Sequence, residues 1–335
     1  MPSLPPLLAR ASRSLMFWLF VLVLVAAALR TAFPVGGYDE VRTGGEPIEL
    51  AVADDGVWVL NFADLTVSLI RPSDEEVLLT AEVGEGLAPT LAANDDGAFV
   101  ILDEGQTVAR VDPGSGEVVD PVDVSGAFDD KAQDLAAGDG FVWVTSALGA
   151  QMVRIDTDTG EVDDTVDLER AASQPQIVGD ALWVNEPDGL GEFDADTGEA
   201  RRVVESSRQI RDYEVTEDGL WILGDVDEED ETALVLRLDP VDGTESDRVE
   251  LTDTVPTHLA VLGDQVFVAG SEGRLMELNA APLALLATEK VARSDKDLRD
   301  VVVAEDVVWV ADGTNGIVHR PIDGIGGIRT DVTLR

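Results

Sequence analysis

The sequence predicts an all-β protein: a seven-bladed β-propeller of four-stranded blades, preceded by one N-terminal hydrophobic helix. Three observations carry this prediction. A turn followed by an aromatic residue between aliphatic ones recurs seven times, and a second turn phrase follows most copies about ten residues later. No helical periodicity interrupts the chain after Leu29, so the repeated units are expected to consist of strands.

Residues 1–35 have the pattern of an export segment. Arg10 and Arg13 precede an uncharged run from Leu15 to Leu29. Fifteen helical residues span about 22 Å, and a few more would reach the roughly 30 Å of a bilayer core. The alanine-rich end of the run also fits a signal-peptide cleavage site. We expect a cleaved signal peptide or, by slight preference, an uncleaved anchor that sends the rest of the chain across the membrane.

One large aromatic side chain marks each repeat. The phrases are "DDGVWV", "DDGAFV", "DGFVWV", "GDALWV", "EDGLWI", "GDQVFV" and "EDVVWV", with the aromatic at Trp58, Phe99, Trp143, Trp183, Trp221, Phe267 and Trp309. Apart from Trp18, every tryptophan occupies this position, and the copies are 38 to 46 residues apart. This spacing is typical of a four-stranded propeller blade, in which a flat ring fills the wedge between neighbouring sheets.

A second phrase lies between the later strands of each unit. It reads "VARVDPGSGEV" from Val108, "MVRIDTDTGEV" from Met152 and "VLRLDPVDGTE" from Val235. An aspartate followed four residues later by glycine is turn chemistry, because glycine readily takes a positive φ. The segments that follow alternate apolar and polar residues, which is typical of an exposed outer strand.

The propeller is expected over residues 47–335. The phrase "GIRTDVTLR" at residues 327–335 is expected to supply the last strand of the seventh blade. Residues 36–46 have two interpretations: they form a linker from the membrane or a closing strand that pairs with the last blade.

The charge of the chain is strongly acidic. It has 67 acidic and 23 basic residues, a formal net charge of −44, and no cysteine. Such a surface repels nucleic acid and anionic lipid, and it attracts cations and basic proteins. The absence of cysteine excludes disulfides, thiolate metal sites and cysteine nucleophiles.

The exported part, roughly residues 47 to 335, resembles bacterial extracytoplasmic seven-bladed propellers of the YVTN and quinoprotein-like repeat type. It is also similar to streptogramin B lyase repeats, in which a "VWV…N" phrase precedes "V-x-R-I-D-P-x-T-G". The quinoprotein motif A-x-D-x-x-T-G-x-x-x-W is matched at Asp156, Thr159 and Gly160, but Asp164 stands at the tryptophan position. The resemblance therefore implies the fold and not a bound quinone.

The lyase resemblance implies a metal-assisted base built on histidine. His258 stands at the entry of an inner strand, whereas His319 is expected on a third strand, far from the channel. No second histidine accompanies His258, so the resemblance supplies no complete catalytic set.

A site is expected where the inner strands begin, at one mouth of the central channel. Positions nine residues before the anchors include Gln174, which Gln176 could replace because the inner segment there is short. The remaining candidates for a ligand or ion site are Glu49, Thr90, Asp134, Asp212, His258 and Asp300. Four carboxylates and an imidazole could hold Ca²⁺ or a cationic group, or they could simply line a water-filled channel.

These expectations define a function. The chain is predicted to be an exported, membrane-tethered propeller that binds protein, glycan or peptide at the cell surface, as a monomer. It is expected to lie at the cell membrane through a single N-terminal span, or to be secreted. The alternative is a metal-assisted lyase or hydrolase with its site at the channel mouth. No catalytic residue is assigned, and no cofactor is expected beyond the Ca²⁺ considered above.

Overall fold

The computed structural model describes residues 38–321 except 147, 217, 227–231, 253, 293–295 and 315–316. These residues form strands β1 to β28 and one short 3₁₀ turn, Ser271–Gly273. The predicted N-terminal helix and the strand predicted at residues 327–335 lie outside the described part. Within that part, none of the helical segments has the length and apolar character needed to cross a bilayer.

Six sheets are each built from four consecutive antiparallel strands. The first three contain β2 (Pro47–Ala53), β3 (Gly56–Asn61), β4 (Thr66–Arg71) and β5 (Glu76–Glu82); β6 (Leu91–Asn94), β7 (Gly97–Leu102), β8 (Thr107–Val111) and β9 (Val118–Asp123); and β10 (Asp134–Gly138), β11 (Phe141–Ser146), β12 (Gln151–Asp156) and β13 (Glu161–Asp167).

The next three contain β14 (Ser173–Val178), β15 (Ala181–Glu186), β16 (Gly189–Asp194) and β17 (Ala200–Glu205); β18 (Ile210–Thr216), β19 (Gly219–Gly224), β20 (Ala233–Leu238) and β21 (Glu245–Leu251); and β22 (Pro256–Leu262), β23 (Gln265–Gly270), β24 (Arg274–Ala280) and β25 (Leu283–Lys290).

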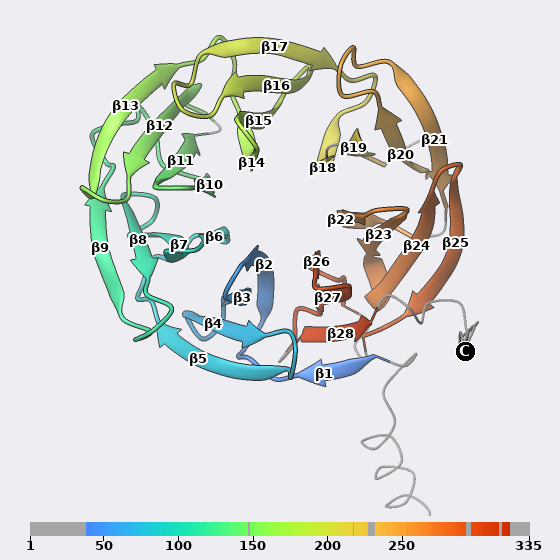
Figure 1. The fold of residues 1–335 in the computed structure, drawn as a ribbon, viewed down its shortest axis with the longest axis horizontal. Coiled ribbons are helices and arrows are strands. Elements are labelled where there is room, and N and C mark those ends of the chain that lie inside the picture. Colours follow the sequence, from blue (N-terminus) through green and yellow to red (C-terminus); the bar gives the residue numbers. More distant parts are fainter. Residues whose placement is uncertain are drawn as a thin grey trace, which may run out of the picture.

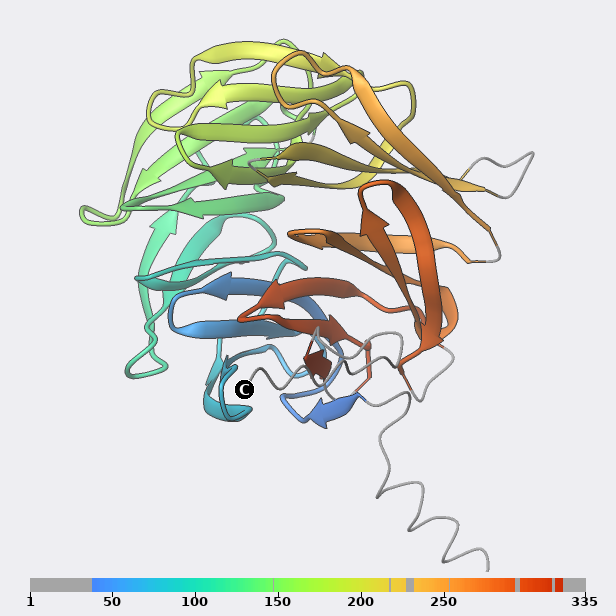
Figure 2. The same ribbon diagram turned by 45° about the vertical axis from the view of Figure 1, so that its right-hand side comes forward.

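A further four-stranded sheet joins the two ends of the described chain. It contains β26 (Asp300–Ala304), β27 (Val307–Ala311), β28 (Ile317–Pro321) and, at its outer edge, β1 (Asp39–Val41). Strand β1 runs antiparallel to β28, with Asp39 opposite His319 (Figure 1 and Figure 2). The segment given above as either linker or closing strand therefore holds the edge where residues 327–335 were expected to pair.

The sheets are arranged around a central axis, and the innermost strands are β2, β6, β10, β14, β18, β22 and β26 (Figure 1). Neighbouring inner strands contact one another in the order β2, β6, β10, β14, β18, β22 and β26, and β26 contacts β2 again. The ring is therefore closed. The predicted all-β propeller of four-stranded blades is confirmed.

All seven anchor aromatics lie on the second strand of a sheet, and each is at most 4% exposed. Each helps to fill an apolar core; Trp143, for example, packs with Leu182 and Phe193 of the next sheet. Its indole N–H also donates to the carbonyl of Ala195 at 2.7 Å. The predicted wedge role of these rings is confirmed.

The aspartate–glycine phrases form the turns before the outer strands. The carboxylate of Asp156 accepts the backbone N–H of Thr159 at 2.7 Å, and the N–H of Gly160 donates to the carbonyl of Asp156 at 2.9 Å. Gly160 has a φ of 67°, which glycine adopts without strain. Asp194 makes the equivalent turn, so these carboxylates hold hairpins.

Candidate functional site

A cavity of about 350 Å³ lies at the hub, lined by residues of all the inner strands or of the chain just before them. It brings together every predicted site residue: Glu49, Thr90, Asp134, Asp212, His258 and Asp300. Gln174 and Gln176, the two alternatives for the fourth sheet, line it as well. We call this space the central cavity.

Irregular pairing places several of these residues. The register between the first and second strands shifts at Pro47/Glu49, Ser173/Gln176, Ile210/Asp212 and Pro256/Leu259. A bulge of this kind disrupts the ladder locally and redirects a side chain. The positions that face the cavity are therefore fixed near the start of the strand, at a nearly constant distance from the aromatic anchor.

Three aspartates of the central cavity link neighbouring sheets. The Oδ2 atoms of Asp134, Asp212 and Asp300 accept the backbone N–H groups of Gln174 at 3.0 Å, Leu259 at 2.7 Å and Leu50 at 2.7 Å. Each acceptor lies on one inner strand and each donor on the next. We call these contacts the inter-sheet clamps, a structural role that the sequence pattern did not reveal.

Neutral side chains make similar links elsewhere. Gln176 donates from Nε2 to the carbonyl of Tyr213 at 2.7 Å, and its Oε1 accepts the N–H of Val215 at 3.3 Å. The hydroxyl of Thr257 donates to the carbonyl of Leu298 at 2.9 Å. Part of the polar lining of the hub therefore serves to join strands.

The central cavity is acidic, and its described lining contains no lysine or arginine. Burial, together with the charges of the surrounding aspartates, raises the pKa of Glu49 well above its usual value. Burial and the carboxylates of Asp212 and Asp300 raise the pKa of Glu214 to about 8. Negative charge is crowded here, because the described lining has several carboxylates and only one histidine, His258, to offset them.

Glu214 was not among the predicted residues. It follows Asp212 by two positions on β18, so the alternation of a strand places both side chains on one face. That alternation is a signal that the sequence carried. The hydrogen bonds from Leu50 and Val301 and the nearby His258 partly offset burial at Asp300, whose pKa is raised to about 6.

His258 lines the central cavity, and its Nδ1 atom is buried without a hydrogen-bond partner. Its charge interaction favours the ionised forms of Asp212 and Asp300. His319 lies on β28, the third strand of its sheet, away from the inner strands. Its backbone position agrees with the sequence prediction.

Among the residues that the structure describes, no group of three or more histidine, aspartate or glutamate side chains is placed to hold a metal ion. One oxygen of each clamp aspartate is already bonded to a backbone N–H. The arrangement is better suited to a diffuse positive charge than to an ion that needs six to eight close oxygen ligands.

Known proteins match this chain mainly through its fold. The family described as "Repeat of unknown function (DUF6923)" matches residues 83–204. No curated protein matches. The hydrazine synthase of Kuenenia stuttgartiensis is similar in structure, with a TM-score of 0.67 and 14% identity over 86% of this chain and 99% of that one.

A computationally designed protein, Ika8, is also similar, with a TM-score of 0.62 and 14% identity over 83% of this chain and 98% of that one. At this level of identity both likenesses show the propeller fold alone. Because one fold carries many unrelated functions, the function must be argued from the site.

Proposed function

We propose that this chain is an exported, membrane-tethered, seven-bladed propeller of the YVTN and quinoprotein-like type that acts as a binding module at the cell surface. The composite sheet of β1 and β26 to β28 is counted as the seventh blade. The match to a repeat family and the propeller-like structural neighbours support the propeller class of this proposal. The uncharged run from Leu15 to Leu29 supports the tether.

The acidic central cavity carries the binding proposal. Five carboxylates line about 350 Å³ with no lysine or arginine and a single histidine, His258, beside them: Glu49, Asp134, Asp212, Glu214 and Asp300. Burial, together with repulsion from the other carboxylates, raises the pKa of Glu49 and Glu214, and a bound cation would relieve the repulsion. The volume is at the small end of ligand pockets, which suits a compact organic cation or the tip of a basic side chain from a protein or peptide partner.

Calorimetry on the full chain in detergent tests this function. Choline, a lysine-containing peptide and calcium chloride are titrated separately into the wild type, Glu49→Gln and Glu82→Gln. Glu82 is an exposed residue on β5, so its variant is a control of equal charge change. We expect binding of an organic cation that Glu49→Gln weakens and Glu82→Gln leaves unchanged. Binding of calcium alone would favour the ion-site version, and no binding would refute the proposal.

Capture from surface extracts identifies the natural partner. The full chain is used as bait with and without a chelator. A partner retained with the chelator present supports direct binding, whereas one lost on chelation indicates a bridging divalent ion.

A second candidate is a metal-assisted lyase or hydrolase, favoured by the unpartnered Nδ1 of His258. His258 would act as the base and the cavity carboxylates as ligands. Co-purification of a divalent ion, together with turnover abolished by His258→Gln at unchanged melting temperature, would support it. A His258→Gln variant that differs only in stability would exclude it.

A further inference from the structure

A second large hollow lies at the outer edge of the propeller, away from the central cavity. It is a groove of about 1250 Å³ between the outer parts of the third and fourth consecutive-strand sheets, lined by residues 164–170, 186–188, 193, 197–203 and 205–209. We call it the rim groove. Most of its charged residues are exposed, and only one of them is buried.

Glu186 lines the rim groove and is only 9% exposed. Its carboxylate has no hydrogen bond to any described residue. Arg170 is close enough to lower its pKa, but burial dominates and raises that pKa overall. Most of the residue is covered by its neighbours, yet none of the described groups hydrogen-bonds its carboxylate, whereas covered acidic groups are normally paired.

The corresponding residues of other sheets show that this is unusual. Glu186 follows its anchor, Trp183, by three positions at the end of the aromatic strand. At the same position Asn61 donates to Ser68 Oγ at 3.0 Å, the hydroxyl of Ser146 accepts the N–H of Gly149 at 3.1 Å, and Asp312 accepts the N–H of Thr314 at 2.8 Å. Those polar groups stabilise their own sheet or turn. Glu186 makes no such bond.

A glycine leaves room for the carboxylate itself. A Cβ atom on Gly191 would lie 2.6 Å from Oε1 of Glu186 and 2.9 Å from Cε2 of Phe193. The carboxylate therefore ends beside the edge of an aromatic ring. Val166 and Leu168 extend the apolar side of the groove and pack against the same core as Phe193.

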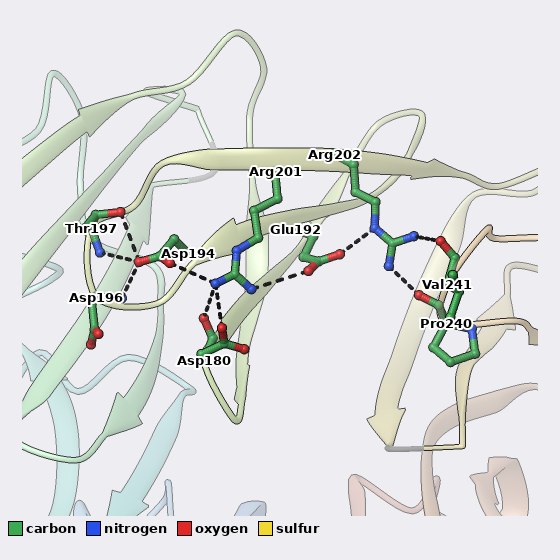
Figure 3. Close-up of polar contacts among 9 residues, drawn as sticks. All are labelled: Asp180, Glu192, Asp194, Asp196, Thr197, Arg201, Arg202, Pro240 and Val241. Atoms are coloured by element: carbon green, nitrogen blue, oxygen red, sulfur yellow. Dashed lines mark hydrogen bonds and ion pairs between the residues drawn. The ribbon is translucent and has the colours of Figure 1, made fainter.

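Three of the basic residues that line the groove have acidic partners: Arg170, Arg201 and Arg202. Arg170 pairs with Asp188 at 2.8 Å. Arg201 and Arg202 both contact Glu192 (Figure 3). Their other partners are Asp180, Asp194 and the carbonyls of Pro240 and Val241. These arginines hold the wall of the groove and join it to the next sheet.

We propose that the rim groove binds an organic cation, a primary ammonium or guanidinium group on an apolar stem, with Glu186 as its counter-ion. The cation would supply the missing hydrogen bonds, while the stem would lie along Phe193, Val166 and Leu168. The groove is large enough for the side chain of a partner protein or for a free amine. This site is separate from the central cavity and does not depend on the function proposed there.

Titration of the full chain in detergent tests the site. The probes are agmatine, cadaverine, a blocked pentapeptide with one central lysine, and the same peptide acetylated on that lysine. The proteins are the wild type, Glu186→Gln and Glu199→Gln. Glu199 is exposed and lines the same groove, so its variant is matched in charge and location. Glu49→Gln reports on the central cavity.

We expect binding of at least one unacetylated probe, weakened about tenfold or more by Glu186→Gln, because a charge-assisted hydrogen bond in a buried site is lost. Glu199→Gln and Glu49→Gln should leave that binding unchanged. Binding of the free amines indicates a small ligand, and binding of the peptide alone indicates a protein side chain. If Glu186→Gln fails to fold, Glu186→Asp withdraws the carboxylate while keeping its charge and should also weaken binding.

The proposal is overturned if no cationic probe binds, or if the acetylated peptide binds as well as the unmodified one. Equal weakening by Glu186→Gln and Glu199→Gln would also overturn it, because that result would show general attraction to an acidic surface.

Discussion

The hub and the rim of this propeller treat the same acidic residue types in opposite ways. At the hub, Asp212 and Asp300 are at most 9% exposed and lie beside other carboxylates, and their pKa values are raised. At the rim, Asp156 and Asp194 accept hydrogen bonds in turns, and their pKa values are lowered. The many acidic residues at the surface are therefore stabilised as carboxylates, whereas the few buried at the hub are ionised only at a cost in free energy.

The difference shows what the hub carboxylates contribute. A rim aspartate stabilises a local hairpin, whereas each clamp aspartate joins two neighbouring sheets. The pair most distant in the sequence is Asp300 and Leu50, which lies where the ring closes. Burial of a carboxylate is unfavourable, but the backbone N–H that it accepts would otherwise be unpaired. The four predictions below test this contrast.

The largest effect is expected from the wedge between sheets. Trp143→Ala should lower the free energy of unfolding by about 3–5 kcal/mol, since it leaves a cavity in a fully buried core. Leu148→Ala is the control, because Leu148 is 84% exposed. Denaturant unfolding measures both. An equal loss in the two variants would contradict the wedge role.

The next effect is a pH dependence from the hub. Because folding raises the pKa of Glu214 from 4.5 to about 8, the folded state holds this proton more tightly than the unfolded chain. The contribution of this proton to the free energy of unfolding is complete below about pH 4.5. It is lost as the pH rises to about 8, at up to about 1.4 kcal/mol per pH unit. Glu214→Gln should remove this decline and stabilise the protein above pH 8.

Unfolding of the wild type and Glu214→Gln across this pH range measures the difference. Glu82→Gln at the rim should follow the wild-type curve. If the stability of Glu214→Gln falls with pH as steeply as that of the wild type, Glu214 is not the group that holds the proton.

A smaller effect is expected from a clamp. Asp212→Ala should cost about 1–3 kcal/mol, because the N–H of Leu259 loses its acceptor in a buried place. Asp212→Asn keeps an acceptor and removes the charge, so it should be close to neutral. Melting temperatures distinguish the two variants. If the asparagine variant loses as much as the alanine variant, the charge itself and not the clamp stabilises the hub.

The smallest effect is expected at the rim. Arg71 pairs with Asp74 at 2.9 Å and with Glu76 at 3.0 Å on an exposed turn. Arg71→Gln should leave the melting temperature unchanged within error, because exposed ion pairs are screened by solvent and salt. A clear drop in melting temperature would mean that the rim contributes more to stability than the comparison with the hub predicts.

The sequence was most informative where the same kind of side chain fills the same packing position in every repeat. Trp58 and its equivalents mark the wedge, so their period predicts the blades, and a fixed offset from them locates the central cavity. The strand β1 was harder to predict, because three residues carry no recognisable alternation. Its assignment depends on the edge of β28, which only the folded chain brings close.

Other features of the sites required the structure for physical reasons. The clamp of Asp134 to Gln174 depends on two sheets meeting at the hub, and no local pattern encodes that distance. Glu186 resembles many other surface glutamates in the sequence. Its isolation becomes visible only when its burial is compared with the bonded residues at the same position in other sheets.

The pairing of β1 with β28 also determines which part of the molecule separates first under force. Tension applied at the N-terminus reaches this short edge strand before any other part of the ring. The three-residue β1 should therefore detach first under load, while the six sheets made of consecutive strands keep their internal pairing. A pulling experiment should record this opening as a small first event, well below the force needed to rupture the remaining sheets.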